Sequence, residues 1–246
     1  MIFKEGRVIH GYNERRVFTG FPQVLTTLQR IVLGSCGMIV CLCGVCAFGA
    51  DVRDLARQVD EHYNQLRSLK ADFTEIYSGT GAERTESGTL WLKKPGKMRW
   101  EYRSPKEKLF LSDGKQAWFY VPGDARVQKI PLKKLDDVRS PLAFLLGKTK
   151  LEKELDGLSM APDIKPSVPG NSVLRGVPKF MADRVNEVVL EVNPQNEIAR
   201  IIIDETDGSV TEYRFTDQRE NAEVPDNSFR FAAPAGVEVV EGDLGP

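Results

Sequence analysis

A turn at Lys94-Pro95-Gly96 separates two runs of alternating apolar and polar residues, and this segment constrains the fold more than any other. Successive side chains of a β-strand point to opposite faces, so each run predicts a strand with one apolar side. If Leu92 pairs with Met98 across the turn, the apolar residues of both strands share one face. These residues are Leu90, Leu92, Met98, Trp100 and Tyr102. The opposite face is charged apart from Trp91, so the segment predicts an amphipathic antiparallel hairpin.

Further short strands separated by tight turns follow this hairpin. Turn dipeptides such as Asp113-Gly114, Pro122-Gly123 and Asp207-Gly208 separate them. The expected strands are residues 69–75, 108–111, 116–121, 126–130, 187–192, 198–204 and 209–216. Their succession predicts one continuous antiparallel sheet. Residues 157–180 are rich in Pro and Gly and are expected to be irregular, and the composition changes too little to divide off a second domain.

Two helices are expected beside the strands. Residues 51–67 place apolar side chains on one helical face, and the Asp51 carboxylate can cap the free amides at the start. The second, Ser140 to Gly147, has a capping serine, a proline at the first position and a terminal glycine. It is apolar almost all round, so it must be covered on several sides or face an apolar space.

The N-terminal region has the layout of a signal peptide. Arg30 precedes an uncharged apolar run, residues 31–48, which ends in the small-residue pattern Ala47-Phe48-Gly49. We expect cleavage after Gly49 or one residue later, so that residues 1–49 are a leader, with an N-terminus that is long for one, and residues 50–246 a single domain. Since the run is about 18 residues long, an uncleaved membrane anchor is the alternative. Cys36 follows a faint lipobox, but few apolar residues precede it, so lipid attachment there is not expected.

Loss of the leader changes the chemistry that the chain can support. It removes all four cysteines, five of the 34 Lys and Arg and two of the 35 Asp and Glu, which leaves 29 and 33 and a net charge of −4. This balance argues against nucleic-acid binding. With His62 as the remaining histidine, zinc and redox chemistry are not expected. His62 itself is expected to lie at the boundary between the apolar and polar faces of the first helix. No nucleophile, phosphate-loop or dinucleotide motif is present, so we do not expect an enzyme.

A basic run has two interpretations. Between Lys93 and Lys108 the sequence holds seven cations and two anions, which are Lys93, Lys94, Lys97, Arg99, Arg103, Lys106, Lys108, Glu101 and Glu107. These residues are either the solvated face of a strand pair or a rim that meets anionic head groups or an acidic partner protein.

Several segments together resemble the outer-membrane lipoprotein carrier family (LolA type), over roughly residues 52–240. They are Phe73-Thr74-Glu75, Gly88 to Pro95, Arg99 to Tyr102, Asp113-Gly114-Lys115, Trp118 to Pro122, Ser140 to Leu146, Phe229-Arg230-Phe231 and Pro234 to Val237. The resemblance implies a mainly β fold, an unclosed antiparallel β-barrel whose concave apolar face is covered by short helices as a lid. It also implies a periplasmic carrier that takes acylated lipoproteins from an inner-membrane ABC lipoprotein-releasing transporter and passes them to an outer-membrane receptor. The family has no cofactor and no catalytic step, and we expect a monomer.

The resemblance also assigns roles to residues. The apolar face of the hairpin would line the acyl cavity, and Leu142, Phe144, Leu145 and Leu146 would form the lid. The family's arginine before the turn proline holds the lid through hydrogen bonds to helix backbone groups. That position is Lys94 here, which keeps the charge but loses the fork of donors, so weaker lid closure is expected. Met98 replaces an aromatic residue and remains apolar but more adaptable.

Other functions remain open at the level of sequence. A membrane-attached receptor of the same fold (LolB type) would need a lipidated cysteine just after the leader. A module that senses mislocalised lipoprotein would normally carry an additional domain, for which the chain has little room. An enzyme would need paired acids in a polar cleft, which sequence spacing alone does not reveal.

Overall fold

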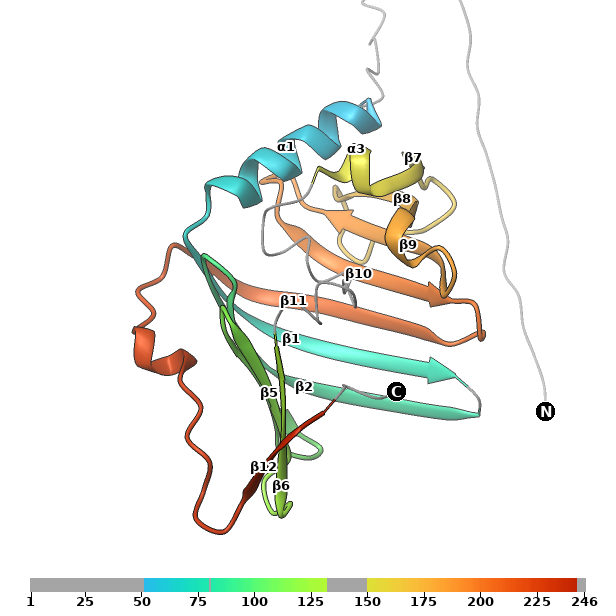
Figure 1. Ribbon diagram of the computed structural model, residues 1–246. Coiled ribbons are helices and arrows are strands. Elements are labelled where there is room, and N and C mark those ends of the chain that lie inside the picture. The colour runs from blue at the N-terminus through green and yellow to red at the C-terminus, as the bar shows by residue number, and fades with distance from the viewer. Residues whose placement is uncertain (1–50, 80, 132–149, 243–246) are drawn as a thin grey trace, which may run out of the picture. The chain divides into compact units, whose positions relative to one another are not determined.

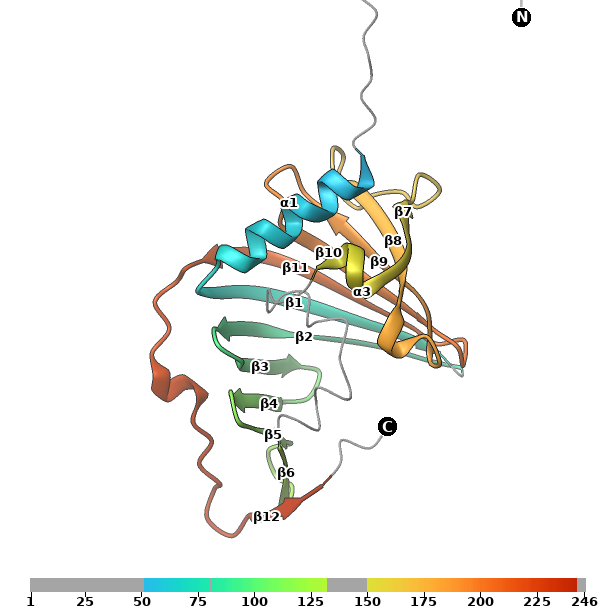
Figure 2. The ribbon, with the colours of Figure 1, turned by 45° about the horizontal axis from the view of Figure 1, so that its top comes forward.

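The computed structural model describes residues 51–79, 81–131 and 150–242, which all belong to one compact unit, Phe48–Pro246. The strands of this part form a single open sheet in the order β12-β6-β5-β4-β3-β2-β1-β11-β10-β9-β8-β7 (Figures 1 and 2). Because β7 and β12 occupy the two edges, the sheet does not close on itself. The expected mainly β, unclosed half-barrel fold is thus confirmed.

The elements have the following bounds in chain order. The first half holds α1 (Val52–Gln65), β1 (Ser68–Gly79), β2 (Ala82–Lys93), β3 (Lys97–Ser104), β4 (Lys108–Asp113), β5 (Gln116–Tyr120) and β6 (Arg126–Pro131). The second half holds α3 (Leu151–Glu154), β7 (Leu155–Met160), β8 (Ser172–Pro178), η2 (Lys179–Met181), β9 (Val185–Val192), β10 (Ile198–Glu205), β11 (Val210–Glu220), η3 (Asp226–Phe229) and β12 (Glu238–Glu241).

Helix α1 forms where the helical period of the sequence predicts it. The Asp51 carboxylate accepts a hydrogen bond from the Arg53 backbone N–H at 3.1 Å, which caps the first turn. The helix ends at Gln65, two residues before the predicted Arg67, because Leu66 is already extended. Figure 2 shows α1 lying across one face of the sheet with α3 beside it. The buried residues of this helix are Leu55, Ala56, Val59 and Tyr63.

The central hairpin has the predicted register. Leu92 pairs with Met98 and Leu90 with Trp100, so the apolar residues of β2 and β3 share one face. Gly88 lies opposite Tyr102 at a shift in this register. A β-carbon on Gly88 would lie 2.0 Å from the Glu101 carbonyl oxygen, so the close approach of the two strands requires glycine here.

The prediction that residues 157–180 are irregular is wrong, since this region contains most of β7 and all of β8. Strand β8 pairs with both β7 and β9, so hydrogen bonds from neighbouring strands order a segment whose Pro and Gly content predicts a loop. Gly176 belongs to this pairing, because a β-carbon there would lie 2.8 Å from the β-carbon of Leu155 in β7. Glycine in this region therefore marks close strand contact as well as turns.

The C-terminal segment adds the one departure from an antiparallel sheet in the described part of the chain. After β11 the chain crosses the outer face through η3 and returns as β12, which pairs in parallel with β6 (Figures 1 and 2). Val224 and Phe229 of this crossing segment are buried, and the Phe231 ring stacks on Trp118 with centroids 6.0 Å apart. The prediction of a fully antiparallel sheet therefore fails at β12.

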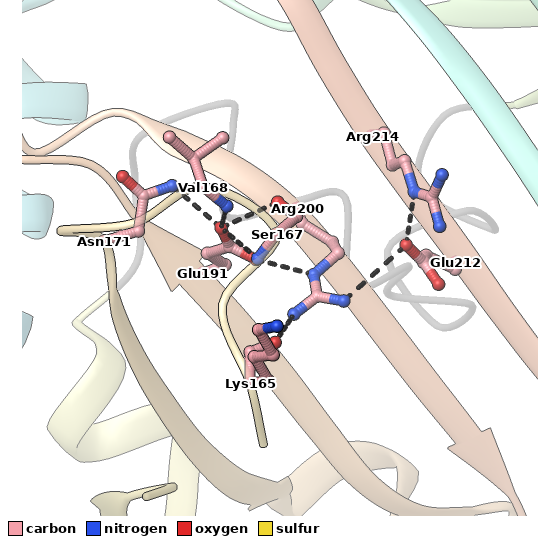
Figure 3. Close-up of polar contacts among 8 residues, drawn as sticks. All are labelled: Lys165, Ser167, Val168, Asn171, Glu191, Arg200, Glu212 and Arg214. Carbon is pink, nitrogen blue, oxygen red and sulfur yellow. Dashed lines mark hydrogen bonds and ion pairs between the residues drawn. The ribbon is translucent and has the colours of Figure 1, made fainter. Parts of the chain in front are cut away.

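A buried carboxylate fixes the loop between β7 and β8 to the outer face of the sheet. Glu191 of β9 has no exposed surface and accepts hydrogen bonds from Ser167 Oγ at 2.7 Å and Asn171 Nδ2 at 2.8 Å (Figure 3). The backbone N–H groups of Ser167 and Val168 donate to the same carboxylate at 2.9 and 3.2 Å. Arg200 Nε on β10 lies 2.7 Å away and completes the charge pair. The loop is thus ordered by one acidic side chain beneath it.

Candidate functional site

The five apolar residues of the hairpin lie together on the face of the sheet that α1 covers. Leu90, Leu92 and Trp100 are at most 4% exposed, and Met98 and Tyr102 are partly buried. All five belong to one hydrophobic cluster that also contains the buried face of α1. The predicted grouping of these residues is therefore present, and their role in ligand binding remains a proposal.

The same face contains aromatic residues that were not among the predicted site residues. Phe73 of β1 contacts the rings of Trp100 and Tyr102 edge-on, with centroids 4.7 and 4.9 Å apart. Tyr213 and Phe215 of β11 lie 5.9 and 6.3 Å from Trp100. Edge-on aromatic contacts of this kind are favourable beyond the area that they bury. The alternation of apolar residues in β1 and β11 was the available signal, but it does not reveal that β11 lies beside β1.

Helix α1 is held over this face by polar contacts as well as by apolar burial. The Tyr63 hydroxyl accepts a hydrogen bond from the Ile198 backbone N–H of β10 at 2.9 Å. On the same helix, Asp60 Oδ2 accepts one from the Leu151 N–H at 2.9 Å, which connects α1 to the start of α3. Burial of this carboxyl raises the pKa of Asp60 to about 6.

Lys94 hydrogen-bonds the C-terminal end of α1. Its Nζ donates to the backbone carbonyls of Tyr63 at 2.6 Å and Asn64 at 3.0 Å. Both carbonyls belong to the last turn, where a helix lacks its full set of donors and where its dipole favours a cation. Lys94 therefore makes to α1 the kind of contact that was expected between the turn and the lid helices, and its function as a latch remains a proposal.

We expect Lys94→Met to lower the free energy of unfolding by about 1–2 kcal/mol, because two charge-assisted hydrogen bonds are lost at a partly exposed site. Amide hydrogen exchange in α1 should rise more than exchange in β9 and β10. Lys94→Arg is the matched control, since its guanidinium keeps charge and donors, and it should stay within about 0.5 kcal/mol of the parent. Unchanged exchange in α1 of Lys94→Met would show that the contact does not hold the helix.

The same face becomes polar at the end remote from Lys94. Glu75 and Glu86 are 8% and 4% exposed, and the Tyr102 hydroxyl donates to Glu75 Oε2 at 2.7 Å. Lys108 Nζ donates to Glu86 Oε2 at 2.5 Å, and Arg84 Nε lies 3.0 Å from the same oxygen. Burial raises the pKa of Glu75, although the Tyr102 hydrogen bond and the nearby cations oppose that rise.

Several members of the basic run have internal partners. Lys93 and Lys97 both pair with Asp226 of η3, at 2.7 and 3.0 Å, and hydrogen bonds from these ammonium groups lower the pKa of Asp226 to about 2. Lys93 also donates to the Val224 carbonyl at 2.7 Å, and Arg99 to the Ser228 carbonyl at 3.3 Å. These cations thus attach the C-terminal segment to the outer face, a use that neither interpretation of the run included.

The described residues contain no group of three or more His, Cys, Asp or Glu side chains that could hold a metal ion. His62 lies 2.6 Å from a Glu220 oxygen, at the boundary position expected for it. Among residues 51–79, 81–131 and 150–242, no helix is long and apolar enough to cross a membrane. The predicted leader, residues 1–49, and the predicted lid residues Leu142, Phe144, Leu145 and Leu146 lie outside the described residues.

Comparison with known proteins identifies relatives along most of this fold. The family model described as outer membrane lipoprotein carrier protein LolA matches residues 64–232. An outer-membrane lipoprotein carrier protein of Nitrosospira multiformis is 30% identical over 179 residues, 71% of this chain and 82% of the relative. One of Chromobacterium violaceum is 31% identical over 180 residues, 72% of this chain and 82% of the relative.

A solved structure supports the fold alone. An uncharacterized conserved protein from Thermus thermophilus superimposes with a TM-score of 0.50 at 11% identity, over 77% of this chain and 98% of that one.

Proposed function

Because this chain belongs to the outer-membrane lipoprotein carrier family, we propose that it is a periplasmic carrier for acylated lipoproteins. It receives them from an inner-membrane ABC transporter that releases lipoproteins and delivers them to an outer-membrane receptor. The mature carrier begins near residue 50 after removal of the leader and acts as a monomer by binding alone, with no catalytic step.

One observation carries the proposal: a single sheet face gathers apolar side chains beneath a helix that polar contacts hold in place. The hairpin contributes Leu90, Leu92 and Trp100, and β11 contributes Phe215. Each methylene withdrawn from water is worth about 0.8 kcal/mol, so several acyl chains make free diffusion of a lipoprotein through water prohibitive. A carrier must offer comparable apolar area and still release its load, which a helix attached at a few points allows.

The hydrogen bonds of Lys94 support the same proposal because they are reversible. Its two contacts to α1 are hydrogen bonds to backbone carbonyls, so they can break and re-form without a change in covalent structure. A ligand that inserts between α1 and the sheet would trade these bonds and the apolar contacts of the helix for contacts with acyl chains. The free energy of the contacts that hold α1 on the sheet is therefore the minimum that the contacts with acyl chains must supply.

Co-purification tests the proposal directly. The full chain with a C-terminal tag is expressed in a Gram-negative host together with one outer-membrane lipoprotein, and the periplasmic fraction is purified on the tag. We expect the acylated lipoprotein to co-purify and its N-terminal peptide to carry acyl chains by mass spectrometry.

A matched control replaces the acylated cysteine of that lipoprotein with serine, and this form should not co-purify. Absence of any acylated species from the purified carrier contradicts the proposal, as does equal recovery of the acylated and serine forms.

A further inference from the structure

On the sheet face that α1 covers, the side chains change from apolar to charged along the strands. At the end next to Lys94, Leu69 pairs with Leu92, and Leu92 pairs with Met98. The next cross-strand row has Ala71, Leu90 and Trp100, and the row after it has Phe73, Gly88 and Tyr102. The following row pairs Glu75 with Glu86. A ligand on this face therefore meets apolar groups at the α1 end and charged groups at the other.

Trp100 lies in the second apolar row, one row before the Phe73 and Tyr102 row that borders the charged end, and it has a buried donor without a partner. Trp100 is 3% exposed, and its Nε1 makes no hydrogen bond to any of the described residues. The surrounding rings are those of Phe73, Tyr213 and Phe215, and Trp100 Nε1 makes no hydrogen bond to the Tyr213 hydroxyl. Since buried indole N–H groups usually find a partner and lose free energy without one, this group needs an explanation.

The chemistry of an acylated ligand provides the missing acceptor. Such a ligand has methylene tails without polar atoms, then a carbonyl oxygen at the head of each chain, then a glyceryl and peptide portion that is fully polar. The face presents the same sequence of properties, from Leu92 through the Trp100 N–H to Glu75 and Lys108.

We propose that the indole N–H of Trp100 donates a hydrogen bond to an acyl carbonyl of the bound lipid, with the tails toward α1 and the polar head toward Glu75. This inference rests on the proposed function. It assigns Trp100 a polar role in addition to its apolar area, and it fixes the direction in which the ligand lies. Because Trp100 is buried, the acyl chain reaches it by replacing groups that now contact the ring.

The test compares lipids that differ only at the carbonyl. A cysteine peptide with two ester-linked glyceryl chains is the first probe, and its diether analogue, which lacks both carbonyls, is the second. Parent protein and Trp100→Phe are titrated with each. We expect the parent to bind the diester about three to ten times more tightly than the diether, the size of one neutral hydrogen bond. Trp100→Phe should bind both probes equally.

A third probe places an N-acyl amide on the diether. If this probe gains more affinity over the diether in the parent than in Trp100→Phe, the acceptor is the amide carbonyl and the proposal still holds.

An NMR measurement on the parent protein covers the case in which Trp100→Phe does not fold. The Trp100 indole N–H proton should move downfield with the diester more than with the diether. Trp91 and Trp118 are internal controls because their strand positions place them on the outer face. If the affinity ratios among the three probes are the same in the parent and in Trp100→Phe, the hydrogen bond is overturned. Failure of the parent to bind any acylated probe instead contradicts the proposed function.

Discussion

Replacing Trp100 with glutamate is expected to abolish binding of acylated ligand, with a dissociation constant at least about 100 times higher. The side chain lies in the middle of the apolar face, between Leu90 on one side and Phe110 on the other. A carboxylate there would be removed from water by the acyl chains without a cation beside it. Burying such a charge costs several kcal/mol, and each 1.4 kcal/mol is a factor of ten in affinity.

The structure adds a cost in folding to this prediction. Trp100 is 3% exposed and contacts the rings of Phe73, Tyr213 and Phe215, so Trp100→Glu should also lower the free energy of unfolding. Sequence reasoning alone predicts loss of binding with folding largely intact, which is not expected for a side chain this deeply buried. Met98→Glu is the better companion variant, because Met98 lies on the same face but is only partly buried.

Trp91→Glu is the matched control on the opposite face of the same hairpin. Trp91 lies between Lys70 and Arg99, with cation-to-centroid distances of 5.6 and 6.0 Å, so a carboxylate at this position has two cations nearby. We expect Trp91→Glu to bind acylated peptide like the parent in a calorimetric titration, while Met98→Glu and Trp100→Glu lose binding. Folding of each variant is checked by its thermal transition. Parent-like affinity in a folded Met98→Glu would remove the covered face from the site.

The sequence predicts those features of this face that depend on residues close together in the chain. Residues 88–103 contain the regularly paired parts of β2 and β3, their turn and the alternation that sets their faces, so the pairing of Leu92 with Met98 follows from the pattern alone. Helix α1 follows equally from its own period and cap. In both cases the pattern lies within the element itself and its immediate neighbours in the chain.

Contacts between distant segments could not be predicted in the same way. Strand β11 lies beside β1 although they are far apart in the chain, so the contribution of Phe215 depends on a pairing that no local pattern encodes. The same holds for β8, whose order comes from β7 and β9, and for the cations that attach residues 224–228 to the outer face. The resemblance assigns Lys94 the role of a latch, but its hydrogen bonds to α1 depend on how a helix some thirty residues earlier in the chain packs against the turn.

The sequence pattern also gives no sign that Glu191 is important for the stability of the fold. It stands in an apolar strand, where an alternating pattern gives no reason to single it out, yet it is fully buried on the outer side and accepts hydrogen bonds from Ser167, Val168 and Asn171 (Figure 3). We expect Glu191→Ala to lower the free energy of unfolding by about 3–5 kcal/mol, because Arg200 and the loop donors lose their shared partner. For a domain of this size the melting temperature should fall by roughly 6–20 °C.

Glu187→Ala is the control on the same strand. Its carboxylate pairs with Arg175 at 3.4 Å with side chains 30% and 25% exposed, so its removal should cost at most about 1 kcal/mol. Similar losses in the two variants would show that the Glu191 cluster is not special.

The contribution of Glu191 to folding stability should also depend on pH. The hydrogen-bond partners of its carboxylate determine whether this contribution rises or falls with pH. Burial opposes its ionisation, but the hydrogen bonds from Ser167, Asn171 and Val168 outweigh burial and hold the pKa of Glu191 below its usual range. The folded state therefore binds this proton more weakly than the unfolded chain, in which glutamate has a pKa of about 4.3. The ionised carboxylate stabilises the fold fully above that value, and this contribution is lost as pH falls through the lower folded pKa.

Chemical unfolding of the parent and Glu191→Ala across a pH series measures this dependence. The stability difference between them should be constant between about pH 6 and 8 and should shrink below about pH 4. A difference that grows with acidification would mean that the carboxyl is protonated in the folded protein and that hydrogen bonds to its neutral form fix the loop.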